Sequence, residues 1–105
     1  MTAISPEVAA QMRDMMIDVV AHGTGFRGAI PGVQVAGKTG TAQTGRDTSH
    51  AWFITFAPAD APTVAVAVIL ENQSNVNEVT GGIDAAPVAK AVVQAALAQP
   101  RPAAP

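Results

Sequence analysis

Seven consecutive apolar residues, Val64 to Leu70, constrain the fold of this chain more than any other stretch. The run is rich in β-branched residues and is far shorter than the about 20 residues that a membrane-spanning helix needs. It follows a turn at Pro58–Pro62. It therefore predicts a strand over Thr63–Glu71 that is covered on both faces and lies centrally in a sheet.

Two more extended segments precede this run. Aromatic and β-branched residues predict a strand over His50–Ala57, and a second strand is expected over Gly37–Gln43 after the entry segment Ile30–Ala36. A polar loop at Thr44–Ser49 separates these two strands. Because short links join neighbouring antiparallel strands, the three strands are expected to form an antiparallel meander.

One helix is expected before the strands and one after them. Ser5-Pro6-Glu7 has the pattern of a helix start, and Gly23 would end that helix. The second helix is expected over Ala85–Leu97, with Asp84 as its N-cap and Pro87 in its first turn. Apolar residues at helical spacing are expected to pack in the core rather than to form a partner groove: Val8, Met12, Met15, Met16, Val19 and Val20 in the first helix, and Val88, Val92 and Val93 in the second.

The composition indicates that these elements belong to a larger body. Of the 105 residues, 49% are hydrophobic and only 13% are charged, which is more apolar surface than two helices and three strands can cover. We therefore expect an α+β chain that is a fragment of a larger helix-covered antiparallel sheet. Residues 1–97 would form the domain part, and residues 98–105 a disordered Pro/Ala tail.

Several classes of function are disfavoured. The net charge is −2, with acids and bases scattered singly, so no nucleic-acid partner is expected. There is no cysteine, and His22 and His50 lie far apart, so neither a metal site nor a cofactor is expected. No membrane segment is visible. The glycine-rich loop at Gly23–Gly32 lacks the spacing of a phosphate-binding loop and is interpreted as turn chemistry.

The segment from Gly37 to Gln43, Gly-Lys-Thr-Gly-Thr-Ala-Gln, is the candidate for chemistry. In a strand, Lys38 and Gly40 would share one face, and Thr39 and Thr41 the other. Gly40 would let a ligand or another backbone approach closely, which suits an anion or an acyl group at a sheet edge. Taken alone, a Lys-Thr-Gly tripeptide more often marks a strand edge with a solvated lysine, so the flanking sequence has to decide.

Lys38–Gln43 resembles the third motif of the penicillin-binding proteins and serine β-lactamases. The lead-in Ala29–Gly37, the strand that begins His50-Ala51-Trp52-Phe53 and the helix entry after Gly81-Gly82 are similar to class B penicillin-binding proteins. The similarity covers Ile4 to about Leu97. It implies the C-terminal part of a peptidoglycan D,D-transpeptidase domain, in a membrane-anchored parent protein on the extracytoplasmic face of the bacterial membrane.

The other two motifs of that family, Ser-x-x-Lys and Ser-x-Asn, do not occur in this chain. Its serines are Ser5, Ser49 and Ser74, none of which is followed at the required spacing by lysine or asparagine. The nucleophile motif is therefore missing, and the chain alone is expected to be inactive.

The resemblance implies a role for each residue of the motif. Lys38 would supply positive charge for proton relay and for attracting a carboxylate. The hydroxyls of Thr39 and Thr41 would bind the terminal carboxylate of a D-Ala-D-Ala stem peptide or of a β-lactam, and the Thr41 N–H would form half of the oxyanion hole. Gly40 would keep the strand open, and Trp52 could line the cleft, although an aromatic residue on a strand is more often core. The implied partners are peptidoglycan stem peptides, β-lactams and the remainder of the transpeptidase domain.

Three alternatives stay open at this point. The chain could belong to a serine β-lactamase, or to a non-catalytic sensor domain that binds β-lactams, or it could be a freestanding structural domain with an accidental Lys-Thr-Gly. The Thr-Ala-Gln after the motif and the His-Ala-Trp-Phe strand favour the transpeptidase over the β-lactamase. Upstream Ser-x-x-Lys and Ser-x-Asn motifs would identify an enzyme.

Overall fold

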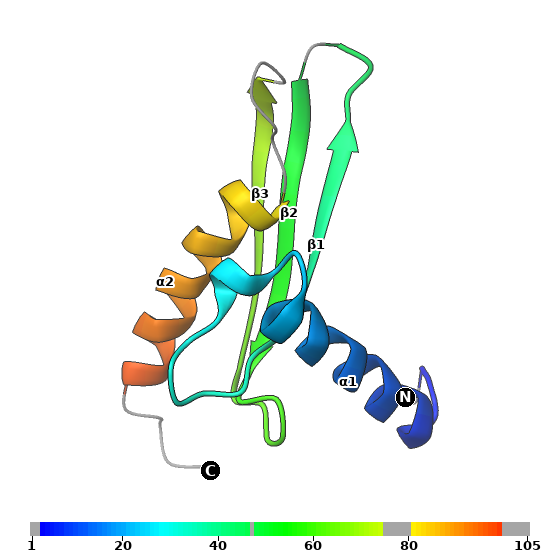
Figure 1. Ribbon diagram of the computed structural model, residues 1–105, viewed down its shortest axis with the longest axis vertical. Coiled ribbons are helices and arrows are strands. Elements are labelled where there is room, and N and C mark those ends of the chain that lie inside the picture. Colours follow the sequence, from blue (N-terminus) through cyan, green and yellow to red (C-terminus); the bar gives the residue numbers. More distant parts are fainter. Residues whose placement is uncertain (1–2, 47, 75–80, 100–105) are drawn as a thin grey trace.

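The computed structural model describes residues 3–46, 48–74 and 81–99 of the chain. In chain order the elements are α1 (Pro6–His22), the 3₁₀ turn η1 (Phe26–Gly28), three strands, the π-helical turn η2 (Gly81–Ala85) and α2 (Ala86–Ala98). The strands are β1 (Ala36–Gln43), β2 (Thr48–Ala57) and β3 (Val64–Ser74) (Figure 1). The expected start of the disordered tail at residue 98 is wrong, because Ala98 is the last residue of α2; residues 100–105 of that tail lie outside the described residues, as do residues 75–80.

The predicted antiparallel meander is confirmed, with strand order β1-β2-β3. The predicted place of the apolar strand Thr63–Glu71 is wrong. Among the described strands, β3 has only β2 as a neighbour, and its Ala65, Ala67 and Ile69 are exposed. The run does form a strand, but in a three-stranded meander the middle position falls to the second strand in sequence.

Helix α1 begins and ends where the sequence predicts. Ser5 is the N-cap, and its Oγ accepts the Val8 N–H at 3.3 Å, while Gly23 is the C-cap. The expected packing of its apolar face is largely wrong. Only Val20 is buried, whereas Met12 and Met15 keep 47% and 58% of their surface exposed. Periodicity places these side chains on one face but does not supply the neighbour that would cover them.

Helix α2 departs from the prediction at its start. The N-cap is Ala85, without a side-chain cap, because Asp84 lies in the π-helical turn that precedes the helix. Of the three valines expected to pack on the sheet, Val93 is buried, but Val88 and Val92 are exposed. The face toward the sheet is made instead by Val93 and small residues, Ala86 and Ala89, which allow the helix to approach closely.

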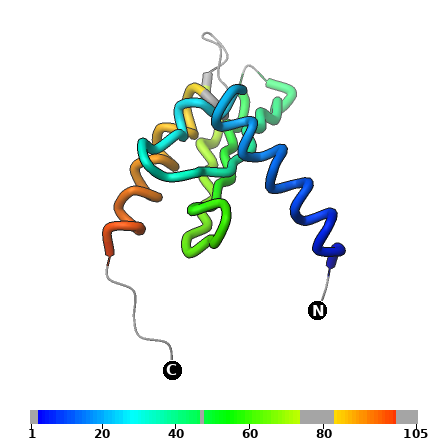
Figure 2. The backbone as a smooth tube through the Cα atoms, turned by 60° about the horizontal axis from the view of Figure 1, so that its bottom comes forward, coloured from blue at the N-terminus to red at the C-terminus, as the bar shows by residue number. Residues whose placement is uncertain are grey.

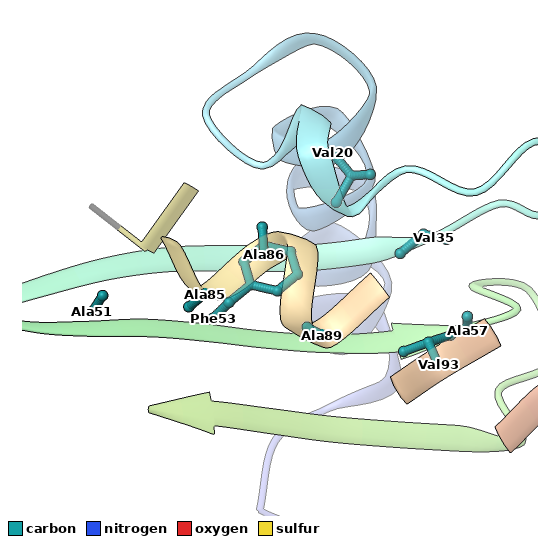
Figure 3. Packing of buried hydrophobic residues seen from close by; sticks show 9 residues of the cluster. All are labelled: Val20, Val35, Ala51, Phe53, Ala57, Ala85, Ala86, Ala89 and Val93. Atoms are coloured by element: carbon teal, nitrogen blue, oxygen red, sulfur yellow. The ribbon is translucent and has the colours of Figure 1, made fainter. Parts of the chain in front are cut away.

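The core lies between α2 and one face of the sheet. Figure 3 shows the Phe53 ring rising from β2 beside Ala85 and Ala86 at the start of α2. Phe53 and Val93 are the largest fully buried side chains. The tube view shows α1 and α2 diverging from each other (Figure 2). Helix α1 contacts β1, and α2 packs against β2 and β3. The two helices therefore pack on different strands of the sheet.

Candidate functional site

The predicted motif Lys38–Gln43 lies on β1, at one edge of the sheet (Figure 1). The strand pairs with β2 in an unbroken antiparallel register that sets Lys38 opposite Ile54, Thr39 opposite Phe53 and Gly40 opposite Trp52. Residues that face each other across antiparallel strands have side chains on the same face of the sheet. The register therefore assigns each side chain of the motif to a face.

Thr39 belongs to the face that carries the core, because its partner Phe53 is fully buried there. Lys38 belongs to the opposite face, together with Ile54, which is 45% exposed. The alternation predicted from the sequence is thus confirmed for the motif. The ammonium of Lys38 donates a hydrogen bond to the backbone carbonyl of Thr39. Its charge therefore lies beside the peptide that also carries the first hydroxyl of the motif.

The surface beside the Lys38 side chain is apolar. A groove of about 400 Å³ runs between α1 and the sheet, lined by Met12, Met15, Met16, Val19, Lys38 and Ile54. The ion pairs of the described residues join Arg13 to Asp14 and Asp18 to His22, so no described carboxylate lies within 4.0 Å of the Lys38 ammonium. Among the residues that the structure describes, the hydrogen bond of the Lys38 ammonium therefore goes to a neutral carbonyl and not to an acid.

Gly40 on β1 and Trp52 on β2 face each other across the two strands. Trp52 is 40% exposed, so the preferred interpretation of this side chain as core is wrong. Among the described residues, a Cβ built on Gly40 would meet nothing closer than the Trp52 Cβ at 3.7 Å, which is ordinary contact. The space at Gly40 is therefore open, as predicted. Trp52 lies directly across the strand pair from the glycine of the motif.

Another glycine of β1, Gly37, has a different reason to be glycine. A Cβ at this position would lie 2.6 Å from Cζ of Phe53, and one on Gly28 would lie 2.9 Å from the same atom. A Cβ on Gly25 would lie 3.2 Å from Cε1 of the ring. The glycine-rich loop after α1 thus packs on the ring of Phe53 through bare backbone. The prediction of turn chemistry for this loop missed its packing role.

Sequence reasoning also missed Thr24. Its Oγ1 lies 2.8 Å from Oγ1 of Thr39, within hydrogen-bond distance, although the two residues are fifteen positions apart. The only signal in the sequence is a hydroxyl residue between Gly23 and Gly25, which by itself is typical of a turn. The structure places Lys38, Gly40 and Trp52 with Ile54 on one face of the sheet, and Thr39 and Thr41 with Thr24 on the core side.

Other classes of site find no support in the described residues. They contain no group of three or more His, Asp or Glu side chains that could hold a metal ion. No helix within the described ranges has the length and hydropathy to cross a membrane. His50 joins β2 to β3 through its side chain. Its Nδ1 accepts the Asn72 N–H at 3.0 Å, beside an irregularity in the β2–β3 register.

Comparison with known proteins gives one consistent family. The family model of the penicillin-binding protein transpeptidase domain matches residues 1–94. The peptidoglycan D,D-transpeptidase PbpA of Mycobacterium tuberculosis is 52% identical over 101 residues, which cover 90% of this chain and 20% of that protein. The chain thus spans about a fifth of the length of the curated relatives it matches.

Solved structures agree with the sequence comparison. Penicillin-binding protein A of M. tuberculosis, solved as a ceftriaxone acyl-enzyme complex, matches with a TM-score of 0.77 and 52% identity, over 90% of this chain and 22% of that one. The transpeptidase domain of the D,D-transpeptidase FtsI4 from Legionella pneumophila matches with a TM-score of 0.77 and 40% identity, over 90% of this chain and 37% of that one. The α+β fold of helices and an antiparallel meander is therefore that of transpeptidase domains.

Proposed function

Because the chain belongs to the family of penicillin-binding protein transpeptidase domains, we propose that it is the substrate-binding C-terminal segment of a peptidoglycan D,D-transpeptidase. The observation that carries the proposal is the placement of Lys38-Thr39-Gly40-Thr41 on an edge strand of the described sheet, with a cation, an open glycine and two hydroxyls at successive positions along that edge. Its substrates would be acyl-D-Ala-D-Ala stem peptides, and β-lactams would bind in their place at the same site. Its place would be the extracytoplasmic face of the membrane.

Each residue has a proposed task in acyl transfer. Lys38 supplies positive charge that attracts the terminal carboxylate and assists proton relay to the attacking serine. The hydroxyls of Thr39 and Thr41 hydrogen-bond that carboxylate, and the Thr41 N–H is one donor of the oxyanion hole. Gly40 leaves room for the substrate to lie along the strand, and Trp52, exposed across from it, lines the same site.

The serine nucleophile has to come from outside this sequence, which contains no Ser-x-x-Lys. We propose that residues 1–97 dock on the remainder of the transpeptidase domain through the groove beside Lys38. The exposed Met12, Met15 and Ile54 support this partner, because a soluble surface seldom leaves so much apolar area together without a partner to cover it.

A chimera tests the function. This chain would replace the matching segment of M. tuberculosis PbpA, and acylation by ceftriaxone would be followed as a mass increase of the intact protein. We expect the chimera to be acylated and its Lys38→Ala variant to react at least about tenfold more slowly, since a charge-assisted contact is worth about 1.5–3 kcal/mol. The isolated chain should show no covalent adduct.

Two outcomes would overturn the proposal. An adduct on the isolated chain would mean that it holds its own nucleophile. A folded chimera that ceftriaxone does not acylate would mean that this segment does not form the site. With an acyl-D-Ala-D-Ala thioester analogue as donor in place of ceftriaxone, acylation without transfer of the acyl group to an amine acceptor would favour a β-lactam sensor. Rapid release of the ceftriaxone acyl group to water would favour a β-lactamase.

A further inference from the structure

The hydroxyl pair of Thr24 and Thr39 joins the glycine-rich loop to the motif strand. The two Oγ1 atoms are 2.8 Å apart, and either can be the donor. Thr39 is half-buried, whereas Thr24 is exposed. Thr39 carries the first hydroxyl of the proposed carboxylate site. The contact with Thr24 restricts the rotation of that hydroxyl.

The loop backbone around Thr24 is held on both sides. The N–H groups of Gly23 and Gly25 both donate to the carbonyl of Val19, at 3.1 Å and 3.0 Å. Gly25 is buried, and its Cα lies so close to Phe53 that an added Cβ would be 3.2 Å from the ring. Phe53 is in turn the cross-strand partner of Thr39. The fully buried Phe53 is therefore a neighbour of both segments: its ring packs on the glycine beside Thr24, and its backbone pairs with Thr39.

The direction of the hydrogen bond follows from the chemistry of the proposed site. A threonine hydroxyl has one proton and two lone pairs. If Thr39 is to donate to a carboxylate, it cannot spend its proton on Thr24, so Thr24 has to be the donor. The result is a chain in which Thr24 donates to Thr39 and Thr39 donates to the carboxylate, and each bond polarises the next.

We propose that Thr24 is a positioning residue that donates to Thr39 Oγ1 and orients the Thr39 hydroxyl toward the carboxylate of the acyl substrate or β-lactam. This inference rests on the proposed function of Thr39. It assigns the glycine-rich loop a role in carboxylate recognition, in addition to its packing on Phe53. Because Thr24 acts through Thr39, its effect should depend on the presence of a carboxylate in the ligand.

The kinetic test uses the PbpA chimera with benzylpenicillin and its methyl ester. We expect Thr24→Val to slow acylation by benzylpenicillin about threefold to tenfold, as loss of one hydrogen bond predicts, and to leave acylation by the ester unchanged. Thr24→Ser should restore the rate. Combining Thr24→Val with Thr39→Val should slow the reaction no more than Thr39→Val alone, because the two act as one unit. The exposed Thr63→Val serves as the matched control.

A spectroscopic measurement is independent of catalysis. Threonine-selective labelling of the same chimera would report the χ1 rotamer of Thr39 through its three-bond couplings. We expect a single rotamer in the unsubstituted chimera and rotamer averaging in Thr24→Val, with Thr63→Val unchanged. A Thr39 rotamer that is the same with and without the Thr24 hydroxyl would overturn the inference, even if the chimera is active. An equal loss of rate for benzylpenicillin and its ester would also overturn it.

If the unsubstituted chimera is not acylated at all, the proposed function fails. The rotamer of Thr39 still decides whether Thr24 holds that side chain, so the two failures are distinguishable.

Discussion

The packing of Phe53 against bare glycine backbone makes Gly37→Ala the most demanding test of the fold around the site. The new Cβ would lie 2.6 Å from Cζ of Phe53 and 3.1 Å from the carbonyl oxygen of Ile54. The ring is fully buried, and a Cβ on Gly28 would be 2.9 Å from the same Cζ. Neither the ring nor the paired strand has room to move away without disturbing a second contact.

The size of the effect follows from two opposing terms. Forcing an extra methyl group into a packed core costs about 1–3 kcal/mol, and a contact this short belongs at the upper end of that range. Replacing a strand glycine by alanine recovers about 0.5–1 kcal/mol of backbone entropy. We therefore expect Gly37→Ala to lower the free energy of unfolding by about 2 kcal/mol. That is a large share of the about 5–15 kcal/mol typical of a domain.

Gly40→Ala is the matched control on the same strand. Its Cβ would meet only the Trp52 Cβ at 3.7 Å, so the entropy term acts alone and the chain should gain up to about 1 kcal/mol. Urea unfolding of the isolated chain would be followed by fluorescence of its single tryptophan, Trp52, at two protein concentrations to detect association. The slope against urea should be the same for all variants.

A second substitution locates the clash. Phe53→Leu shortens the side chain and removes Cζ, so it should destabilise the otherwise unchanged chain but partly rescue Gly37→Ala, with a coupling of about 1 kcal/mol or more. Equal stability of Gly37→Ala and Gly40→Ala would refute the reasoning, because it would mean that the ring of Phe53 does not fill the space at Gly37.

Two further predictions concern the strand pair and the groove. Thr55→Val should lower the free energy of unfolding by about 1–2 kcal/mol in the same assay, because it removes the buried bond from Thr55 Oγ1 to the Ala36 carbonyl at 2.7 Å; the exposed Thr63→Val should change it by less than about 0.5 kcal/mol. Met15→Lys should reduce self-association of the isolated chain in sedimentation velocity, since Met15 is 58% exposed in the groove, but should destabilise the PbpA chimera, where the remainder of the domain would cover it. A Met15→Lys chimera as stable as the unsubstituted one would contradict the proposed docking face.

The sequence was sufficient for the elements and for the motif, because both depend on local chemistry. Ser5, Pro6 and Gly23 mark the ends of α1 through backbone groups within one turn of each residue, and alternation alone separates Lys38 from Thr39. The same patterns could not tell which apolar faces are covered. The exposed apolar residues are as apolar as their buried neighbours, and their exposure depends on which other elements are present: Met12, Met15, Val88 and Val92.

The contacts that define the site could not be predicted for a related reason. Gly25, Gly28 and Gly37 come from different segments, and each is glycine because of one ring, that of Phe53. Thr24 meets Thr39 where the loop packs on that ring, next to the strand position that pairs with Phe53. Contacts that join the loop, β1 and β2 leave no periodic pattern in the sequence. The glycine-rich loop therefore showed only the pattern of a turn. For Asp84, the π-helical turn shifts the helix start beyond the residue that has the best capping side chain.

The split of the motif between two faces restricts how a ligand can bind. Lys38 rises on the groove side and Thr39 on the core side, so no ligand lying on one face can reach both side chains. A ligand that contacts both has to lie along the edge of β1, where the Lys38 ammonium bends back to the carbonyl of Thr39. On that path it passes Gly40, where a side chain would rise on the same face as Lys38, next to Trp52. An extended peptide running beside the strand meets these conditions, since its own backbone presents polar groups at the same spacing as the edge. The edge of β1 that is unpaired among the described strands, the position of the Lys38 ammonium and the bare Gly40 are therefore compatible with the peptide-like acyl substrate of the proposed function.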